Sequence, residues 1–219
     1  RYRCSLTALR LIFLRFIQKR TLKKADGVIF LSKYAQTEVQ DITGPLHENI
    51  IIPHGVNEKF LSPPAQQRPI ESYTSDKPFR ILYVSIIDVY KHQWHVISGL
   101  AHLRKKTGWP LTLDLIGPAY APALNRLNKT IEQHDRDRNW VRYHGNSDKN
   151  NLRKFYASAN LGVFASSCEN MPNILLETMA FGLPIASSNC GPCTEIIGPE
   201  GVYFNPENPI EIEISIKSL

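Results

Sequence analysis

The stretch 164–191 constrains the fold of this chain more than any other part of the sequence. An apolar run, 161–165, precedes and enters it, with the length and composition of a buried strand. Pro172 then stands where a helix can begin, because the first helical position tolerates a missing N–H. The residues that follow have helical spacing and stop at Gly182-Leu183-Pro184. The stretch therefore predicts a strand, a loop, a helix and a second strand.

The loop and the start of this predicted helix carry groups that bind a phosphate and its neighbours. The free amides of Asn173, Ile174 and Leu175 would make the helix N-terminus an anion site. Glu169 in the loop and Glu177 in the helix bracket that site. Carboxylates repel phosphate, but they accept hydrogen bonds from the vicinal hydroxyls of a ribose or a hexose. A phosphate between two sugars is a nucleotide sugar, and this is the ligand that the pattern predicts.

Glu169 and Glu177 have seven residues between them, and their surroundings are distinctive. Together they resemble the E-x7-E motif of retaining glycosyltransferases with the GT-B fold. The context that matches is Ser166, Pro172-Asn173, Leu176-Glu177, Met179-Ala180 and Gly182-Leu183-Pro184. A glutamate pair alone would be weak evidence; in this context the chain is similar to glycosyltransferase family four (group 1 type). Within that family it most resembles members that build bacterial surface polysaccharides and O-antigens.

An alternation of short strands and longer helices begins at Phe79. The predicted strands are 80–84, 111–116, 141–143, 161–164 and 184–186, and the predicted helices are 93–106, 122–134, 150–159 and 173–181. This alternation predicts an α/β fold, a Rossmann-like parallel sheet with helices on both faces. Ligands of such sheets bind at the carboxyl ends of the strands, where Ser85, Gly117, Gly145 and Glu169 would meet.

The residues before Phe79 have a different organisation. Local patterns predict a helix over 5–24, a buried strand over 25–32, a helix over 33–41 with Ser32 as N-cap, a strand over 49–52, and a linker or surface loop over 58–78. Pro53-His54-Gly55-Val56-Asn57 resembles the interdomain hinge of the family, where Gly55 would supply a backbone angle that other residues avoid.

These features predict a fragment of a two-domain enzyme. Residues 1–57 would be the remnant of an N-terminal, acceptor-binding domain plus the hinge. Residues 58–219 would be the C-terminal nucleotide-sugar-binding domain of a GT-B fold, truncated at its end.

The positive charge of the chain is concentrated at its start. The net charge is +6, yet 1–24 carries eight Lys or Arg and no acid, and the rest has 18 basic and 20 acidic residues. A nucleic-acid partner is therefore not expected. The helix over 5–24 would place Leu6, Leu9, Phe13, Phe16 and Ile17 on one apolar face. Such a helix either packs on a domain core, which we favour, or contacts an anionic membrane surface.

Cysteine use and hydropathy give the expected compartment. The four cysteines are too few and too irregular for a disulfide framework, and no apolar run approaches the ~20 residues of a membrane span. We expect a cytoplasmic protein, with peripheral contact to the inner membrane face through 1–24 as an alternative.

The resemblance to the family implies roles for individual residues. Lys91 would be the cation for the donor diphosphate and Glu169 would hold hydroxyls of the transferred sugar, which makes both candidate catalytic residues. The implied donor-binding residues are Glu177 on the ribose, Asn173, Ile174, Met171 and Ser85, with the base beside Gly145 and Asn146. Ile86 stands where relatives have an arginine, so helix amides or the missing domain would supply that half of the clamp.

Each of these residues could also be present without a ligand to bind. Lys91 alone could be a solvated surface lysine. Acids near a helix N-terminus are stabilised by its dipole, which would explain one of the two glutamates. Gly145 could simply mark a turn.

Cys190-Gly-Pro-Cys193 has the letters of a thioredoxin active site. No tryptophan precedes it and only one helical turn follows, so we disfavour a redox role. A zinc site would need a second Cys/His pair, and a catalytic metal would need a carboxylate cluster. We expect no cofactor and no metal, with Lys91 and helix amides neutralising the leaving group.

The expected parent enzyme is a retaining hexosyltransferase of cell-surface polysaccharide synthesis. It would move a hexose from a UDP- or GDP-sugar to a saccharide or lipid-linked acceptor, and we expect the fragment alone to be inactive. Two alternatives remain: a nucleotide-sugar-binding module without turnover, and a sugar nucleotide epimerase that shares the GT-B fold.

Overall fold

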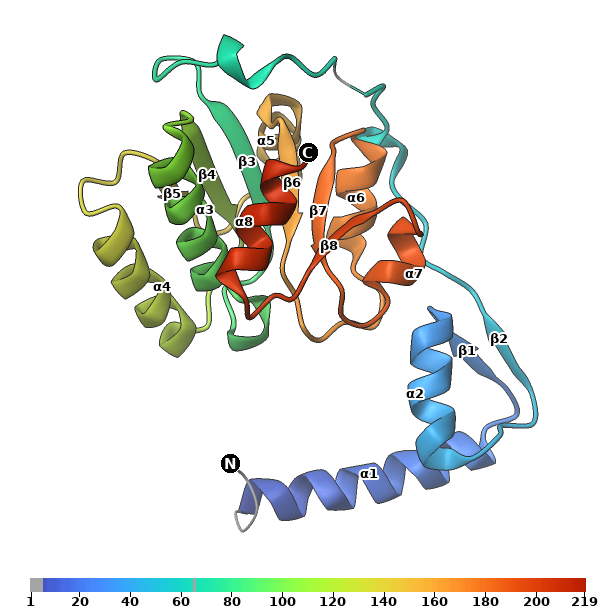
Figure 1. Ribbon diagram of the computed structural model, residues 1–219. Coiled ribbons are helices and arrows are strands. Elements are labelled where there is room, and N and C mark those ends of the chain that lie inside the picture. The colour runs from blue at the N-terminus through green and yellow to red at the C-terminus, as the bar shows by residue number, and fades with distance from the viewer. Residues whose placement is uncertain (1–5, 65) are drawn as a thin grey trace. The chain divides into compact units, whose positions relative to one another are not determined.

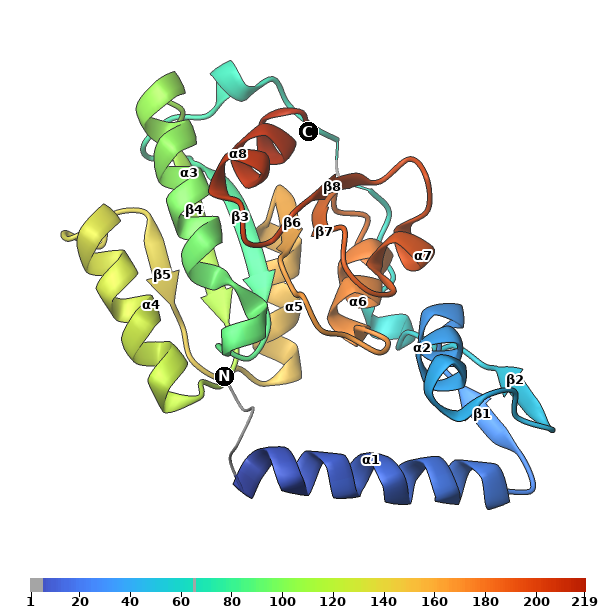
Figure 2. The same ribbon diagram turned by 60° about the horizontal axis from the view of Figure 1, so that its bottom comes forward.

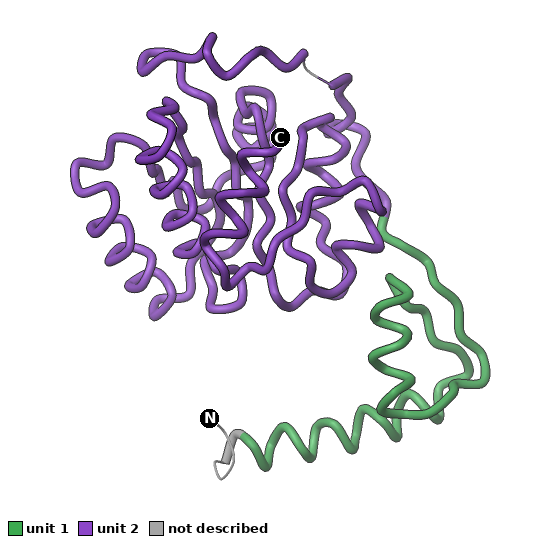
Figure 3. The backbone as a smooth tube through the Cα atoms, viewed as in Figure 1, with its two compact units in different colours: residues 1–54 green, residues 55–219 purple. Residues whose placement is uncertain are grey.

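The computed structural model describes residues 6–64 and 66–219. The chain forms two compact units, residues 1–54 and residues 55–219 (Figure 3). The division falls at His54 and Gly55, inside the motif that resembles a hinge. Gly55 is not among the glycines with positive φ, so the prediction that it supplies an unusual backbone angle is wrong.

The first unit contains two helices and two short strands. Its elements are α1 (Leu6–Lys24), β1 (Val28–Phe30), α2 (Lys33–Thr43) and β2 (Asn49–Ile51). β1 and β2 pair in parallel, and Ser32 caps α2 by accepting a hydrogen bond from the amide of Ala35 at 3.1 Å, as predicted. The expectation of a buried strand holds for Phe30 but not for Ile29, whose side chain is exposed.

Exposed apolar side chains surround α1. Leu11, Ile12 and Leu14 are exposed along with Leu9 and Phe13. Because a helix advances about 100° per residue, Leu11 lies about 160° around the helix from both Leu9 and Phe13. The prediction of a single apolar face on this helix is therefore wrong. Among the described residues, no helix has the length and hydropathy needed to cross a membrane.

The second unit is a parallel α/β sheet (Figures 1 and 2). Its strands are β3 (Phe79–Val84), β4 (Leu111–Ile116), β5 (Val141–Tyr143), β6 (Leu161–Phe164), β7 (Ile185–Ser188) and β8 (Val202–Phe204). Its helices are α3 (Gln93–Thr107), α4 (Ala121–His134), α5 (Lys149–Ser158), α6 (Asn173–Ala180), α7 (Cys193–Ile197) and α8 (Pro209–Lys217), with short 3-10 turns at Glu58–Phe60, Ile70–Ser72 and Val89–Lys91. The strand order is β5-β4-β3-β6-β7-β8, which confirms the predicted fold class.

The two faces of this sheet bury separate apolar clusters. Leu113 and Leu115 of β4 pack with residues of α3, α4 and α8 on one face. Ile116 packs with Tyr156 of α5 and residues near α6 on the other. Phe60 joins this second cluster and is buried, so the segment 58–78 is partly packed on the sheet rather than being only a linker.

The chain order reverses between β3 and β6. These two strands share only the pairs Ile81↔Leu161 and Leu82↔Gly162, so β3 extends two residues beyond its pairing with β6. In open α/β sheets the ligand crevice lies at the carboxyl ends of the strands at such a switch point. The loops that leave β3 and β6 are therefore where a site is expected.

Candidate active site

Tyr83 joins the two loops at the switch point. Its hydroxyl donates a hydrogen bond to the carbonyl of Lys91 at 2.7 Å and accepts one from the amide of Ala165 at 3.2 Å. The side chain is 1 % exposed, and burial raises the pKa of Tyr83 well above its ordinary value. The phenol therefore stays protonated and holds the loop after β3 against the loop after β6.

Lys91 and Glu169 form a nearly buried ion pair at this point. Lys91 ends the 3-10 turn Val89–Lys91, which Asp88 caps by accepting a hydrogen bond from the amide of Val89. Its Nζ donates to Oε1 of Glu169, and only 9 % and 14 % of the two side chains are exposed. The rings of Tyr90 and Phe164 lie 5.1 and 5.2 Å from Nζ. The sequence placed both residues at one site but did not predict their direct contact.

His92 and Ser167 add a second link between the same loops. The His92 Nε2 lies 2.8 Å from Oγ of Ser167, and the amide of Ser167 donates to the carbonyl of Tyr90. His92 has a left-handed φ of 50° and is buried. Burial lowers the pKa of His92, and the nearby His95 lowers it further. Sequence reasoning missed this histidine, and its only signal was its place directly after Lys91.

Ser85 is held by a side chain that sequence reasoning also missed. The Gln93 amide nitrogen donates to Oγ of Ser85 and to the carbonyl of Ile86, both at 2.9 Å. Ser85 is 7 % exposed. Its hydroxyl therefore fixes the turn after β3, and a ligand would meet the backbone of this turn sooner than the Ser85 side chain.

The N-terminus of α6 has some of the free backbone amides that the sequence predicted. Asn173 is exposed, while Ile174 and Met171 are partly buried. Pro172, the residue just before the helix, makes no side-chain capping hydrogen bond. The amide of Leu175 donates to the carbonyl of Pro172 at 3.0 Å, so the prediction that this amide is free is wrong. The anion-binding amides of the prediction are thereby reduced to those of Asn173 and Ile174.

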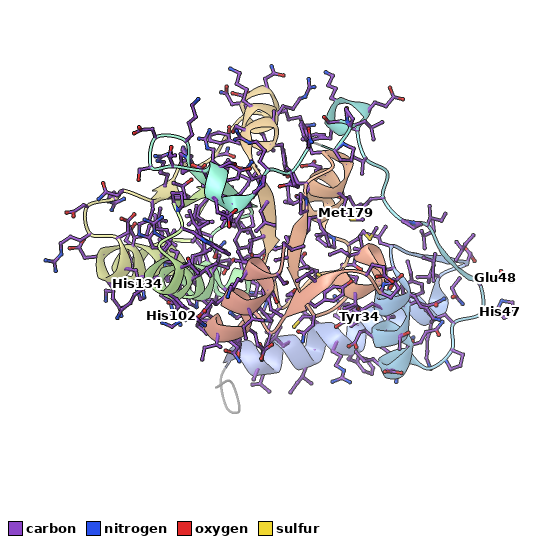
Figure 4. The ribbon with its side chains drawn as sticks, turned by 45° about the horizontal axis from the view of Figure 1, so that its top comes forward. Tyr34, His47, Glu48, His102, His134 and Met179 are labelled. Atoms are coloured by element: carbon purple, nitrogen blue, oxygen red, sulfur yellow. The ribbon has the colours of Figure 1, made fainter. Side chains whose placement is uncertain are left out.

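Glu177 is half-buried and separate from the Lys91 pair. Burial raises the pKa of Glu177, while Tyr156, whose hydroxyl donates to Oε2 at 3.5 Å, and the charge of Lys149 lower it. Met179, two residues further along α6 and labelled in Figure 4, is 38 % exposed. The two glutamates of the motif thus have different partners.

Gly145 and Asn146 lie at the end of β5. The carbonyl of Gly145 accepts a hydrogen bond from the amide of Gly117 at 2.8 Å, and Gly145 has a φ of 70°. This backbone conformation supports its interpretation as a turn glycine. Asn146 is exposed and lines a cavity of about 430 Å³ beside α5, together with His144 and Phe155.

Three predicted site residues lie outside four cavities found among the described residues. Their volumes range from about 230 to about 500 Å³, and Lys91, Glu169 and Glu177 border none of the four. Asn146, which lines the cavity beside α5, is the predicted donor residue that does border one of the four.

The two cysteines of the Cys-x-x-Cys pattern are free thiols. Cys193 is buried on the short α7 and Cys190 is partly exposed. Burial raises the pKa of both thiols, which is the reverse of the lowered pKa that a redox cysteine needs. Within 6–64 and 66–219, no group of three or more His, Cys, Asp or Glu side chains is arranged to hold a metal.

The chain is similar to known proteins in both sequence and fold. Residues 78–219 match the family described as "Glycosyl transferases group 1". A glycogen synthase of Mycobacterium tuberculosis is 25% identical over 208 residues, which cover 93% of this chain and 47% of that protein. O-antigen chain mannosyltransferase B of Escherichia coli is 32% identical over only 69 residues, 32% of this chain and 18% of that protein.

Solved structures with the same fold come from larger proteins. Sucrose-phosphate synthase from Thermosynechococcus elongatus superposes with a TM-score of 0.79 at 24% identity, covering 98% of this chain and 54% of that chain. Anabaena HepE in complex with UDP-glucose gives a TM-score of 0.78 at 18% identity, covering 93% and 57%. The predicted GT-B type of α/β fold is confirmed, and the chain spans about half the length of these relatives.

Proposed function

The chain belongs to the glycosyl transferases group 1 family, and from this premise we propose that it is the donor-binding half of a retaining hexosyltransferase. The observation that carries the proposal is the Lys91–Glu169 pair at the switch point of the sheet. Such a pair has little value as a structural contact, because desolvating two charges costs about as much as their attraction returns. The pair is well suited to a binding site in which an anionic ligand replaces the Glu169 carboxylate as the partner of Lys91.

Lys91 would act on the diphosphate of a nucleotide sugar. When the diphosphate binds, Nζ moves from Glu169 to phosphate oxygens, and the amides of Asn173 and Ile174 add further donors. As the glycosidic C–O bond breaks, the electron pair stays on the departing nucleoside diphosphate, and the fixed positive charge of Lys91 stabilises it. No metal is needed for this neutralisation.

Glu169 and Glu177 would hold the two sugars. Once Lys91 turns to the diphosphate, Glu169 is free to accept hydrogen bonds from hydroxyls of the transferred hexose. Glu177, already half-buried against Tyr156, would accept those of the ribose. The turn of Ser85, Met171, Gly145 and Asn146 would border the base and the sugar. The Anabaena neighbour bound to UDP-glucose favours a uridine nucleotide as the donor.

The remaining parts of the proposal concern the whole enzyme. Residues 1–57 would belong to the acceptor domain and the hinge. The helix in 1–24, with its basic residues and with exposed apolar side chains such as Leu9 and Phe13, would pack on the core of that domain or, as the alternative, contact an anionic membrane on the cytoplasmic side. The acceptor would be a saccharide or a lipid-linked saccharide of a surface polysaccharide. The partial likeness to O-antigen chain mannosyltransferase B supports this choice.

A nucleotide-sugar-binding module without turnover is the second candidate. It is favoured by the site itself, in which Lys91, Glu169 and Glu177 are all assigned to the donor. Turnover separates the two: the module binds the donor and transfers nothing, even when the missing domain is supplied. A sugar nucleotide epimerase would instead isomerise the donor in the absence of any acceptor.

Calorimetric titration with UDP, GDP and uridine tests the proposed site. We expect UDP to bind more tightly than uridine, and Lys91→Ala to abolish most of that difference. Lys129→Ala, which removes an exposed lysine of α4, is the matched control and should bind both ligands unchanged. Equal affinities for UDP and uridine in the unmodified chain would overturn the diphosphate role of Lys91.

A further inference from the structure

One face of the sheet carries polar side chains near the β5 edge. Arg80 of β3 pairs with Thr112 of β4, and Asp114 of β4 pairs with Arg142 of β5. Paired residues of neighbouring strands, and residues two apart on one strand, point to the same face of a sheet. All four therefore share one face, while Leu113, between two of them, points into the apolar cluster of the other face.

A cavity of about 500 Å³ lies over the amino ends of these strands. Arg80, Thr112 and Arg142 line it, together with Tyr73 and Lys77. Its volume is within the range of roughly 300–1,000 Å³ that is usual for small-molecule sites. Because Lys91 follows the carboxyl end of β3 and Arg80 lies near its amino end, this cavity is at the opposite edge of the sheet from the proposed donor site.

The charges around this cavity are mostly positive. Arg68, Lys77, Arg80 and Arg142 line it, against one acid, Asp76. The nearest buried acid, Asp114, lies 3.7 Å from Nε of Arg80 and accepts a closer contact of 2.7 Å from Nε2 of His144. The excess positive charge in a concave site favours a ligand with two negative charges.

Thr112 has an unsatisfied hydroxyl at this cavity. The residue is 5 % exposed, and among the described residues its Oγ1 has no hydrogen-bond partner. Buried hydroxyls in folded proteins almost always have a partner, so one is expected from outside the chain. Since Thr112 lines the cavity, rotation about its Cα–Cβ bond would bring the hydroxyl to a ligand there.

The wall next to these cations is held in place by hydrogen bonds. The Asn160 side chain accepts from the amide of Arg80 at 2.8 Å and donates to the hydroxyl of Tyr73 at 3.0 Å. The guanidinium of Arg68 lies over the Tyr73 ring, 4.8 Å from its centroid. The cavity thus has a fixed polar wall and an aromatic ring beside its cations.

We propose that this cavity binds the phosphate monoester of a small molecule, such as a sugar phosphate, at a site separate from the donor site. Arginine forks bind the oxygens of a phosphate in pairs, and a phosphate monoester carries nearly two negative charges near neutral pH. The phosphate would lie between Arg80 and Arg142, and the rest of the molecule would lie toward Tyr73. The cavity is large enough for an ester and needs no residue of the proposed donor site.

Titration with inorganic phosphate and with glucose 6-phosphate tests this site. We expect glucose 6-phosphate to bind more tightly than phosphate, and Arg142→Gln to weaken it about tenfold, the loss expected for a charged hydrogen bond. Thr112→Val, which has the same shape, should weaken binding several-fold without lowering the melting temperature. Arg142 is exposed, so its substitution should leave the fold intact.

Two control variants separate binding in this cavity from binding at the donor site and from nonspecific attraction. Lys129→Gln removes one exposed positive charge of α4 and should leave both affinities unchanged, as should Lys91→Gln at the proposed donor site. A loss of binding in Lys91→Gln would mean that the phosphate binds at the donor site, and an equal loss in Lys129→Gln would mean nonspecific attraction. The proposal would be overturned by either of these losses, by equal affinities for the two ligands, or by a failure of both ligands to bind.

Discussion

Replacing Glu169 with glutamine should move stability and nucleotide affinity in opposite directions. In the free protein, Glu169 neutralises Lys91, which is 7 % exposed. Glu169→Gln keeps the size of the side chain and an oxygen that can accept a hydrogen bond from Nζ, but it leaves the lysine charge without a counter-ion. The folded protein should lose stability, while the site for a diphosphate should gain a free cation and lose a repelling carboxylate.

The size of both effects follows from the surroundings of Lys91. Removing one partner of a fully buried ion pair costs about 3–5 kcal/mol, whereas exposed pairs contribute about 0–1 kcal/mol. Glu169 is partly reached by water, and the rings of Tyr90 and Phe164 near Nζ offset part of the lost attraction. We therefore expect unfolding to become easier by about 2 kcal/mol. The affinity for UDP should rise about fivefold, or about 1 kcal/mol, while that for uridine stays the same.

Urea denaturation and calorimetric titration measure the two quantities on the same preparations. Glu132→Gln is the matched control, because Glu132 pairs with Arg136 on the surface of α4 at 3.4 Å and its loss should cost well under about 1 kcal/mol. If Glu169→Gln weakened UDP binding as Lys91→Ala does, the carboxylate would be a ligand of the nucleotide rather than a competitor for the lysine. Unchanged stability would mean that the pair is looser than the structure places it.

Three further predictions follow from groups around the site. Glu177→Ala should weaken the binding of UDP several-fold in a titration, yet leave the binding of 2′,3′-dideoxy-UDP unaffected. Burial raises the pKa of Glu177, so its protonated form stabilises the fold at low pH, and this contribution is lost as the pH rises through the folded-state pKa. Glu177→Gln should therefore be at least as stable as the unmodified chain at pH 7. Burial lowers the pKa of His92 and His134, so the unfolded state takes up more protons and urea midpoints should fall as pH drops below about 6.5; a midpoint that rises instead contradicts this. Gly117→Ala should lower the free energy of unfolding by about 3 kcal/mol or more, because the added Cβ would clash with a backbone oxygen. Gly145→Ala, in open space at φ 70°, should lower it by only about 1 kcal/mol. Equal losses of stability for the two variants on denaturation would be evidence against the close contact of Gly117.

Local periodicity predicted most of the second unit. The strands 111–116, 141–143 and 161–164 have the predicted bounds, because apolar runs between polar turns are a local signal. β8 (Val202–Phe204) was not predicted. The strand predicted over 184–186 is longer in the structure: β7 extends to Ser188, whose hydroxyl donates a buried hydrogen bond to the carbonyl of Ser166.

Contacts between distant residues could not be predicted in the same way. Lys91 and Glu169 are 78 residues apart, and only the position of β6 beside β3 brings them together. The motif indicated that both belong to one site, but their pairing depends on Tyr83, which joins the loops through one hydroxyl. The roles of Gln93 and His92 are likewise set by side-chain contacts that no spacing reveals.

Ile86 stands where the resemblance to the family implies an arginine, and the structure shows which group holds this turn instead. Gln93 donates to the hydroxyl of Ser85 and to the carbonyl of Ile86, so a neutral amide fixes the turn from which the arginine would project. In the proposed site, Lys91 would be the cation that the loop after β3 provides, and Glu169 would compensate its charge until a diphosphate binds. A single cation paired in this way should bind phosphate more weakly than a lysine–arginine pair would. Donor binding would then depend on the free energy needed to break the Lys91–Glu169 ion pair. For this reason the opposite response of stability and UDP affinity to Glu169→Gln is the direct test of the site.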